Sequence, residues 1–226
     1  MMTWEAMIKD VMENGRAEWP DFLSHAETRA LRDEALLLHQ NGAFKTAGIG
    51  RGRDHTQNTG VRLDETLWFD EEKLRPAQQA LWSRLHEMMA ELNRALYLGL
   101  WEIEGHFAFY QPGAFYARHV DRFQDDDLRV VSCVVYLNLN WQPGDGGELK
   151  FFNRRQSDKS ASKSVTGSDA DSGADSGAER GTVIEPAGGK LVCFLSDKTE
   201  HEVLRTLVPR LSFAGWFRCR PKGQMD

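Results

Sequence analysis

The sequence has 226 residues, of which 41% are hydrophobic, and a formal net charge of −6 at pH 7. This length suits one globular domain with decorations, and the apolar content is enough for a sizeable core. The acidic balance disfavours nucleic acid as a partner, because nucleic-acid binding normally depends on an excess of Lys and Arg. Residues 48–55 form the one local basic stretch.

The sequence carries no signal for export or for membrane insertion. It contains no uninterrupted run of 18 apolar residues, and its first 15 residues include acids where a signal peptide would be basic and then apolar. Cys133, Cys193 and Cys219 form neither a CxxC pair nor an even disulfide framework. We therefore expect a soluble, cytoplasmic protein without membrane contact, whose cysteines fill the core, and we assume a monomer.

A first amphipathic helix is predicted over residues 25–41. Ser24 and Glu27 have the spacing of a capping box, and apolar residues then recur at helical intervals until Gly42. Such a stripe is typical of core packing rather than of a functional face. We assign residues 1–44 to an N-terminal helical segment that packs on the core.

A second helix is predicted from Pro76, a residue that suits the first helical position. Its apolar stripe continues to Leu96, and Gly99 can end it. Both helices precede residues 100–220, which complete a main domain over residues 45–220.

After Gly99 the sequence changes to short β-rich runs separated by Gly, Pro, Asn and Asp. The runs are HFAFY, FYARHVD, RVVSCVVYLN, GELKFF, GTVIEP, KLVCFL, HEVL and RLSFAGWFR. Many short strands that follow helices predict a mainly β fold, an antiparallel sandwich or barrel supported on one side by helices.

Residues 156–180 interrupt the β region with Ser, Asp, Gly and Ala, and Val165 is their only large apolar residue. This composition cannot bury enough surface to order itself. The flanking runs still look like consecutive strands, so we predict a disordered loop inside the domain rather than a domain boundary.

His119, Asp121 and His201 are the candidate metal ligands. Residues i and i+2 of a strand project from the same face, so His119 and Asp121 can act together, and His201 lies at the start of a later predicted strand. Two imidazoles and one carboxylate are the donor set of a facial-triad Fe(II) site. This donor set alone does not choose the metal.

Arg210 follows His201 by nine residues and begins a largely apolar predicted strand. Its planar guanidinium can hold the distal carboxylate of a dicarboxylate cosubstrate through two parallel hydrogen bonds. An arginine at the exposed end of a strand is the alternative, and the residue pattern leaves both open.

The order of four segments resembles the 2-oxoglutarate- and Fe(II)-dependent dioxygenases, and within them the bacterial relatives of the prolyl 4-hydroxylases that act on hypoxia-inducible factor. The segments are YQPGAFYARHVDRF, RVVSCVVYLNLNWQPGDGGELKFF, GTVIEPAGGKLVCFLSDKTEHEV and RLSFAGWF, and the resemblance covers roughly residues 45–218. It implies a double-stranded β-helix (jelly-roll) core and a dioxygenase domain over residues 45–220. It also implies Fe(II) on His119, Asp121 and His201, with 2-oxoglutarate and O2 as cosubstrates and ascorbate as supporting reductant.

The resemblance implies further site residues. Arg210 and Tyr136 would bind the C5 carboxylate of 2-oxoglutarate. Tyr110 resembles a tyrosine that lines the cosubstrate and substrate side, although the local spacing is one residue shorter than in the animal enzymes. Trp216 matches a pocket tryptophan that closes the site against water, with core filling as the alternative.

Residues 47–69 resemble the mobile loop that folds over the peptide substrate in these hydroxylases, and their glycines would supply flexibility. Arg51, Arg53 and Arg62 would contact substrate backbone or acidic side chains; a solvated basic loop is the alternative. The acidic run at 125–127 is interpreted as a solvated turn.

The resemblance implies hydroxylation of an unactivated C–H bond coupled to conversion of 2-oxoglutarate to succinate and CO2. A prolyl residue of a protein, hydroxylated at C4, is the expected substrate, and a free amino acid or small metabolite is the alternative. A cupin-like metal enzyme would need no dicarboxylate clamp such as Arg210 and Tyr136. The sequence HEMMAEL at His86 lacks the second histidine of the zinc-binding motif HExxH. A non-catalytic 2-oxoglutarate-sensing module is the remaining alternative.

Overall fold

The computed structural model describes residues 2–48, 60–122, 128–152 and 181–221. Arg51 and Arg53, the acidic run at 125–127 and the insert at 156–180 lie outside the described residues, so the predictions made for them stay predictions. In the described part of the chain, no helix offers an apolar stretch long enough to span a lipid bilayer.

The elements follow the predicted order of helices first and strands afterwards. The helices are α1 (Trp4–Asn14), α2 (His25–Gln40) and α3 (Pro76–Leu96), with a short 3-10 turn, η2 (Glu71–Lys73), before α3. The strands are β1 (Arg16–Trp19), β2 (Lys45–Thr46), β3 (Asp64–Trp68), β4 (Leu100–Tyr110), β5 (Tyr116–His119), β6 (Arg129–Tyr136), β7 (Leu149–Phe152), β8 (Gly181–Ile184), β9 (Leu191–Leu195), β10 (His201–Val203) and β11 (Arg210–Cys219).

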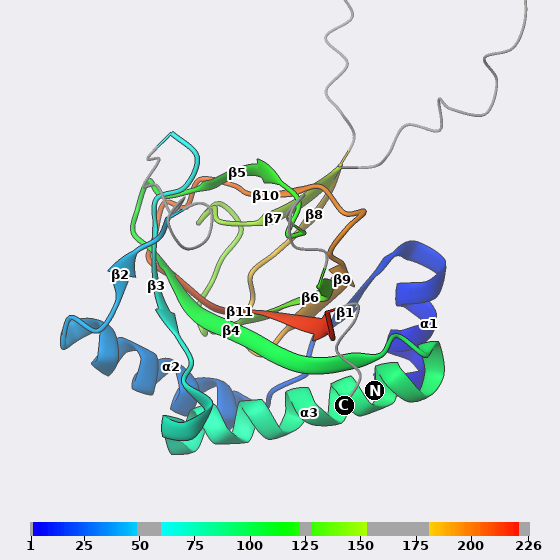
Figure 1. The fold of residues 1–226 in the computed structure, drawn as a ribbon. Coiled ribbons are helices and arrows are strands. Elements are labelled where there is room, and N and C mark those ends of the chain that lie inside the picture. Colours follow the sequence, from blue (N-terminus) through cyan, green and yellow to red (C-terminus); the bar gives the residue numbers. More distant parts are fainter. Residues whose placement is uncertain (1, 49–59, 123–127, 153–180, 222–226) are drawn as a thin grey trace, which may run out of the picture.

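Two antiparallel sheets face each other (Figure 1). The larger sheet has the strand order β1-β9-β6-β11-β4-β3-β2, and the smaller has the order β5-β10-β7-β8. The helices cover the outer face of the larger sheet, and α3 runs along it below β4 and β11 (Figure 1). The predicted antiparallel sandwich with helices on one side is confirmed, and the fold is the double-stranded β-helix that the resemblance implied.

The two faces of β11 contact different parts of the protein, because successive side chains of a strand point to opposite faces of a sheet. Leu211, Phe213 and Phe217 pack with the helices in one buried apolar cluster. Arg210 and Trp216 lie on the other face and line a pocket between the sheets. The helix-packed core and the pocket therefore share one strand.

The capping box of α2 is confirmed. The Ser24 hydroxyl accepts a hydrogen bond from the Glu27 amide at 3.2 Å, and the Glu27 carboxylate accepts one from the Ser24 amide at 2.7 Å. These contacts satisfy two amides that the first helical turn leaves without backbone partners.

The predicted end of the second helix at Gly99 was wrong. α3 ends at Leu96 because Tyr97 adopts a left-handed conformation with φ of 52°. The side chain of Asn93 accepts a hydrogen bond from the Leu100 amide and donates one to the Leu100 carbonyl, both at 2.8 Å. This bridge turns the chain directly from the helix into β4.

Three strands, β1, β2 and β3, lie outside the predicted β-rich runs. β1 belongs to the N-terminal segment and pairs with β9, while β3 lies within residues 47–69 and pairs with β4. The prediction of a loop over all of residues 47–69 was therefore wrong for Asp64–Trp68. β7 and β8 pair with each other across residues 153–180, as the prediction of consecutive strands required.

A pair of glycines explains the tight packing of the sheet on the helices. Gly105 of β4 and Gly215 of β11 are register partners, and the ring of Phe213 covers both. A Cβ atom on Gly105 would lie 2.3 Å from Cζ of Phe213, and one on Gly215 would lie 2.6 Å from Cε1. The Phe213 ring is fully buried and its centroid lies 5.0 Å from that of the tilted Phe69 ring, so it has little room to move.

We expect Gly105→Ala to lower the free energy of unfolding by about 1–3 kcal/mol, the usual range for overpacking a core. Chemical denaturation of the purified protein measures this. Because the clash is with the Phe213 ring, the same substitution in a Phe213→Leu background should be less destabilising than in the parent. Equal losses in both backgrounds would contradict this origin of the strain.

Candidate active site

The structure brings His119, Asp121 and His201 together. His119 ends β5 and His201 begins β10, and the two residues are register partners. Asp121 lies just past the end of β5, and its carboxylate oxygens are 3.5 Å from Nε2 of His119 and 3.7 Å from Nε2 of His201. Ligand bonds of about 2.0–2.2 Å that meet near right angles place donor atoms roughly 3 Å apart, close to this spacing.

Backbone contacts orient both imidazoles toward the aspartate. Nδ1 of His119 donates to the Ala117 carbonyl at 2.8 Å, and Nδ1 of His201 donates to the Thr199 carbonyl at 3.0 Å. A carbonyl oxygen only accepts, so the Nδ1 atoms carry the protons and the Nε2 atoms present lone pairs. The ring nitrogens that face Asp121 are therefore the ones able to bind a metal.

Electrostatics favours the ligand forms of two of these groups. Burial raises the pKa of the Asp121 carboxyl, but the neighbouring His201 and His119 outweigh it and lower the pKa well below the ordinary range. Burial lowers the pKa of His201 to about 4, which the attraction of Asp121 only partly offsets. A carboxylate and a neutral imidazole are the forms that bind a cation.

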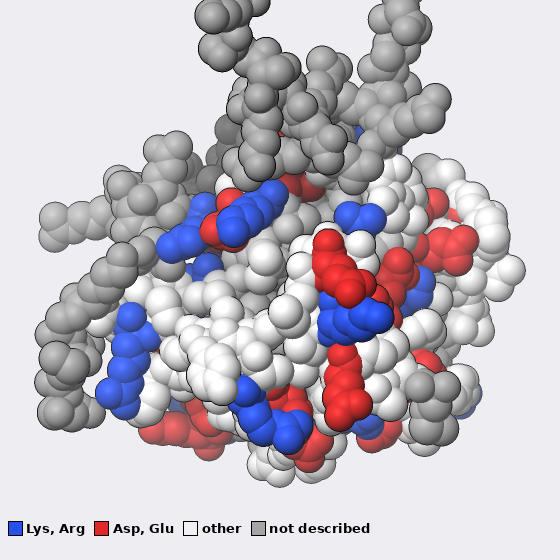
Figure 2. All heavy atoms as spheres, turned by 90° about the vertical axis from the view of Figure 1, so that its right-hand side faces the viewer, with Lys and Arg blue, Asp and Glu red and all other residues white. Residues whose placement is uncertain are grey.

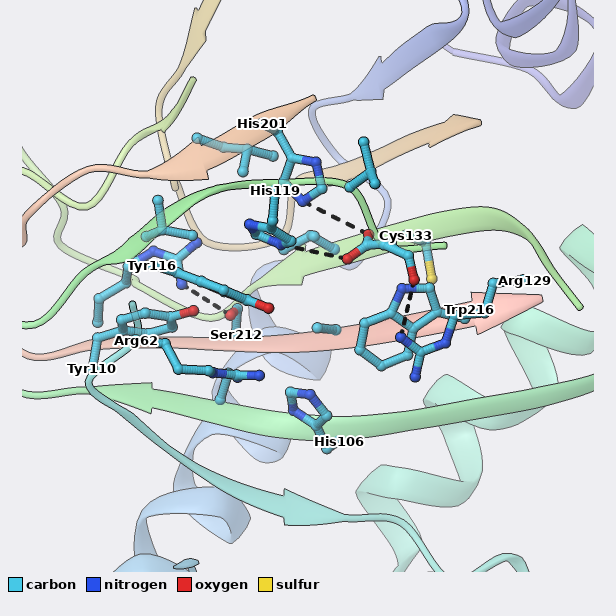
Figure 3. Close-up of a pocket in the computed structure, with 18 of the residues that line it drawn as sticks. Arg62, His106, Tyr110, Tyr116, His119, Arg129, Cys133, His201, Ser212 and Trp216 are labelled. Atoms are coloured by element: carbon cyan, nitrogen blue, oxygen red, sulfur yellow. Dashed lines mark hydrogen bonds and ion pairs between the residues drawn. The ribbon is translucent and has the colours of Figure 1, made fainter. Parts of the chain in front are cut away.

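Tyr116 supports the metal-facing position of His119. Its ring stacks on the His119 ring at 3.6 Å between centroids and 14° between planes. The guanidinium of Arg62 lies 4.4 Å from the same tyrosine ring, and Figure 3 shows Tyr116 between His119 and Arg62. Arg62 in turn donates to both carboxylate oxygens of the fully buried Asp64, at 2.7 and 2.5 Å.

Arg210 is a buried cation inside the same pocket. Its Nε donates to the Gly147 carbonyl at 2.8 Å, and its Nη1 donates to the Ser212 hydroxyl at 3.1 Å. No carboxylate of the described residues pairs with it. A buried charge without a counter-ion is unfavourable, so this position fits an anionic ligand. The alternative of an arginine at an exposed strand end is wrong, because Arg210 is only 2% exposed.

Tyr136 and Tyr110 flank this guanidinium, which lies 5.2 Å and 4.7 Å from their ring centroids. Burial raises the pKa of Tyr136 to about 12, so its hydroxyl stays protonated. That hydroxyl is fully buried and has no hydrogen-bond partner among the described residues. An orphaned donor beside an unneutralised arginine fits one end of a dicarboxylate such as 2-oxoglutarate.

Trp216 and Arg129 form the opposite wall. The guanidinium of Arg129 lies 3.7 Å from the Trp216 ring centroid, and its Nη1 donates to the backbone carbonyl of Asp121 at 3.3 Å. Its Nε donates to the Glu104 carboxylate at 2.7 Å. The indole N–H of Trp216 is buried without a partner in the described part of the chain, so Trp216 is a pocket residue and not simple core filler.

One cavity of about 150 Å³ joins these groups (Figure 3). The predicted site residues that line it are Tyr110, His119, Asp121, His201, Arg210, Trp216 and Arg62. Tyr136 lies behind it, in contact with Arg210. Of the three arginines predicted for the substrate loop, only Arg62 is described.

Sequence reasoning did not single out His106, Tyr116 and Arg129, which line the pocket, or Asp64, which holds the lining residue Arg62. Two residues of β5 lie between Tyr116 and His119, whereas only one residue of β10 lies between their partners Val203 and His201, so β5 contains a bulge. Simple alternation places Tyr116 and His119 on opposite faces, and the bulge brings them together. Arg129 did carry a signal, as a charged residue at the head of the nearly all-apolar run RVVSCVVYLN.

Comparison with known families supports this geometry. A family model described as the 2OG-Fe(II) oxygenase superfamily matches residues 105–218. Egl nine homolog 1 from Homo sapiens is 26% identical over 223 residues, which cover 94% of this chain and 46% of that protein. The chain thus spans about half the length of this relative.

Solved structures share the whole fold. A prolyl-4-hydroxylase from Pseudomonas putida has a TM-score of 0.77 and 34% identity, covering 96% of this chain and 99% of that one. A prolyl hydroxylase from Trichoplax adhaerens, in complex with a peptide fragment of the hypoxia inducible factor oxygen degradation domain, has a TM-score of 0.76 and 21% identity, covering 95% and 88%. Since the family model covers half of the chain and the Pseudomonas protein is 34% identical over nearly all of it, this chain belongs to the 2OG-Fe(II) oxygenase superfamily.

Proposed function

We propose that this protein is an Fe(II)- and 2-oxoglutarate-dependent dioxygenase that 4-hydroxylates a prolyl residue in a protein substrate. The observation that carries the proposal is the buried guanidinium of Arg210, which has no acidic partner among the described residues and lies in one cavity with His119, Asp121 and His201. A cupin-like metal enzyme has no use for such an anion site.

In this proposal His119, Asp121 and His201 hold Fe(II), and Arg210 with Tyr136 holds the distal carboxylate of 2-oxoglutarate. The bound metal with 2-oxoglutarate and O2 supplies the oxidation, which yields succinate and CO2 and places one oxygen atom in the substrate C–H bond. No protein side chain has to act as acid or base. The side chains fix ligand geometry, hold the cosubstrate and exclude water.

The chain's own residues divide this work. The backbone contacts of the two histidines and the Arg129 contact to Asp121 fix the ligand atoms. Tyr110 covers the Arg210 guanidinium, and burial keeps the Tyr110 phenol protonated by raising its pKa. Trp216 closes the other side of the cavity. Ascorbate as reductant and a cytoplasmic setting remain part of the proposal.

A prolyl substrate is supported by the shape and chemistry beside the metal group. Aromatic surfaces of Tyr116 and Trp216 line the cavity near His119 and Asp121, and they fit an apolar pyrrolidine ring. The two solved structures described above are a prolyl-4-hydroxylase and a prolyl hydroxylase, and the second was solved with a peptide. A free amino acid is the second candidate, because the cavity also contains charged groups.

The surface supports a protein rather than a nucleic-acid substrate. On the face in Figure 2, Lys and Arg side chains alternate with Asp and Glu and form no continuous basic stripe. Several charges of the described residues pair, such as Arg118 with Glu200 and Arg122 with Asp197. Nucleic-acid binding needs a concentrated positive surface.

The role of Arg210 predicts a specific kinetic change. We expect Arg210→Met to raise the KM for 2-oxoglutarate about 10- to 100-fold, because a charge-assisted hydrogen bond contributes about 1.5–3 kcal/mol. Gly147→Ala should act in the same direction, since its Cβ would lie 2.8 Å from Cδ of Arg210. Succinate release at varied 2-oxoglutarate measures both effects.

Gly144→Ala is the matched control, because Gly144 also has positive φ but no atom near its Cβ position. A KM shift of the same size in Gly144→Ala and Gly147→Ala would mean that loop strain, and not the Arg210 contact, is responsible. An unchanged KM in Arg210→Met would contradict the proposed anion site.

The substrate prediction is tested by capture. Asp121→Ala lacks the carboxylate ligand and should retain substrate without converting it, whereas Asp197→Ala, at an exposed ion pair, should stay active. Proteins captured by Asp121→Ala are digested, treated with the parent enzyme, Fe(II), 2-oxoglutarate and ascorbate, and examined by mass spectrometry. We expect a prolyl peptide that gains one oxygen atom; oxidation of a free metabolite alone would contradict the protein substrate.

A further inference from the structure

His106 is a pocket histidine that the proposed chemistry does not use. It lies in β4, opposite Trp68 of β3 and Ala214 of β11, and it is only 3% exposed. Figure 3 shows its ring pointing from β4 into the pocket, on the side away from His119 and His201. It does not belong to the group of metal-ligating side chains.

Two indole rings hold the His106 ring in place. The Trp68 ring meets it edge-on at 4.7 Å, and the Trp216 ring lies 5.5 Å away. The two tryptophans also stack on each other at 5.9 Å. His106 is therefore one polar position within an aromatic wall that lines the cavity.

The hydrogen bonds of His106 fix its chemical form. Nδ1 donates to the Phe107 carbonyl at 3.1 Å, which leaves Nε2 with a lone pair when the ring is neutral. Burial, assisted by the positive charge of Arg62, lowers the pKa of His106 to about 4. The ring is thus neutral at physiological pH, and Nε2 is an acceptor.

This acceptor has no donor in the described part of the chain. An open acceptor in a cavity wall can be satisfied by a donor of the ligand, and one such hydrogen bond is worth about a factor of ten in affinity. The contrast with His119 and His201 is clear, because their Nε2 atoms face Asp121. The His106 ring instead lines the cavity on the side away from them (Figure 3).

We propose that His106 is a specificity-determining residue that accepts a hydrogen bond through Nε2 from a backbone N–H of the substrate, next to the residue that is oxidised. This inference rests on the proposed peptide substrate. A prolyl nitrogen within a peptide has no N–H, so the nearest donors are the amides of the flanking residues. The aromatic wall accepts the apolar part of the same segment.

The charges around His106 favour a neutral amide over an ammonium group. The positive charges of Arg62 and Arg129 both act on the ring, and the Asp64 carboxylate only partly opposes them because it is paired with Arg62. The ammonium group of a free amino acid would add a third positive charge to Arg62 and Arg129. The donor that fits is an uncharged peptide N–H. The proposed function then includes recognition of the substrate backbone next to the residue that is oxidised.

The test uses a mixture of end-blocked heptapeptides that share a central proline and vary elsewhere. Peptides that gain one oxygen are identified by mass spectrometry, and the best one is resynthesised in two forms, each N-methylated at one amide flanking the proline. Steady-state kinetics are measured for the parent protein, His106→Phe, His106→Gln and the control His86→Gln, which alters an exposed histidine of α3.

We expect His106→Phe to raise the peptide KM about tenfold with a smaller change in kcat, because an acceptor is lost while an aromatic ring is kept. His106→Gln, which retains an acceptor, should restore part of the affinity. One of the two N-methyl groups should raise the peptide KM of the parent protein about tenfold but should not raise the KM of His106→Phe any further. Such non-additivity is the signature of a direct contact. His86→Gln should match the parent.

Two outcomes would overturn the inference, and they differ. In the first outcome, peptides are oxidised but neither N-methyl group raises the peptide KM of the parent protein, or each N-methyl group raises the KM of His106→Phe as much as that of the parent. His106 then does not bind an amide, and the proposed function stands. If no heptapeptide gains oxygen, the proposed function fails and the inference fails with it. The comparison of methylated peptides needs only the parent protein, so it holds even if a variant does not fold.

Discussion

The buried positive charge of Arg210 is the constraint on which the pocket depends. A cation removed from water destabilises a fold by several kcal/mol unless other groups compensate it. Here a backbone carbonyl of Gly147, a hydroxyl of Ser212 and the faces of Tyr110 and Tyr136 surround the guanidinium. These groups are dipoles and π surfaces, so they orient the charge without neutralising it. In our proposal the distal carboxylate of 2-oxoglutarate completes the compensation.

The arrangement of the two sheets positions the Arg210 guanidinium inside the pocket. β11 places Arg210 and Trp216 in the pocket while Phe213 anchors the opposite face in the helix-packed core. The paired glycines Gly105 and Gly215 leave room for the Phe213 ring against the sheet. The smaller sheet supplies the other half of the site, because the antiparallel pairing of β5 with β10 sets His119 beside His201. The candidate metal ligands and the proposed anion site thus lie on different sheets and share one cavity.

Much of this could be predicted from the sequence. The β-rich runs matched strands because Gly, Pro, Asn and Asp mark their ends, and the capping box of α2 is a local pattern. His119, Asp121, His201 and Arg210 were identified by residue type and spacing together with family resemblance, and the structure gathers them into one cavity. Their chemical roles are proposals that the geometry supports.

What the sequence did not reveal depends on non-local geometry. The bulge in β5, which brings Tyr116 onto His119, has no marker in the residue pattern. The position of His106 in the pocket follows only from the pairing of β4 with β3 and β11. Its unsatisfied acceptor appears only when burial and partners are known. In our proposals these residues contribute to substrate recognition, whereas the residues predicted from the sequence hold the metal and the cosubstrate.

The most direct test of the central claim is an anaerobic titration of the Fe(II)-loaded protein with 2-oxoglutarate, followed by the visible absorbance of the metal complex. The account predicts a band that saturates at one 2-oxoglutarate per protein and is absent in Asp121→Ala. A parent protein that binds Fe(II) but develops no band, or a band of equal strength in Asp121→Ala, would contradict the assignment of the site.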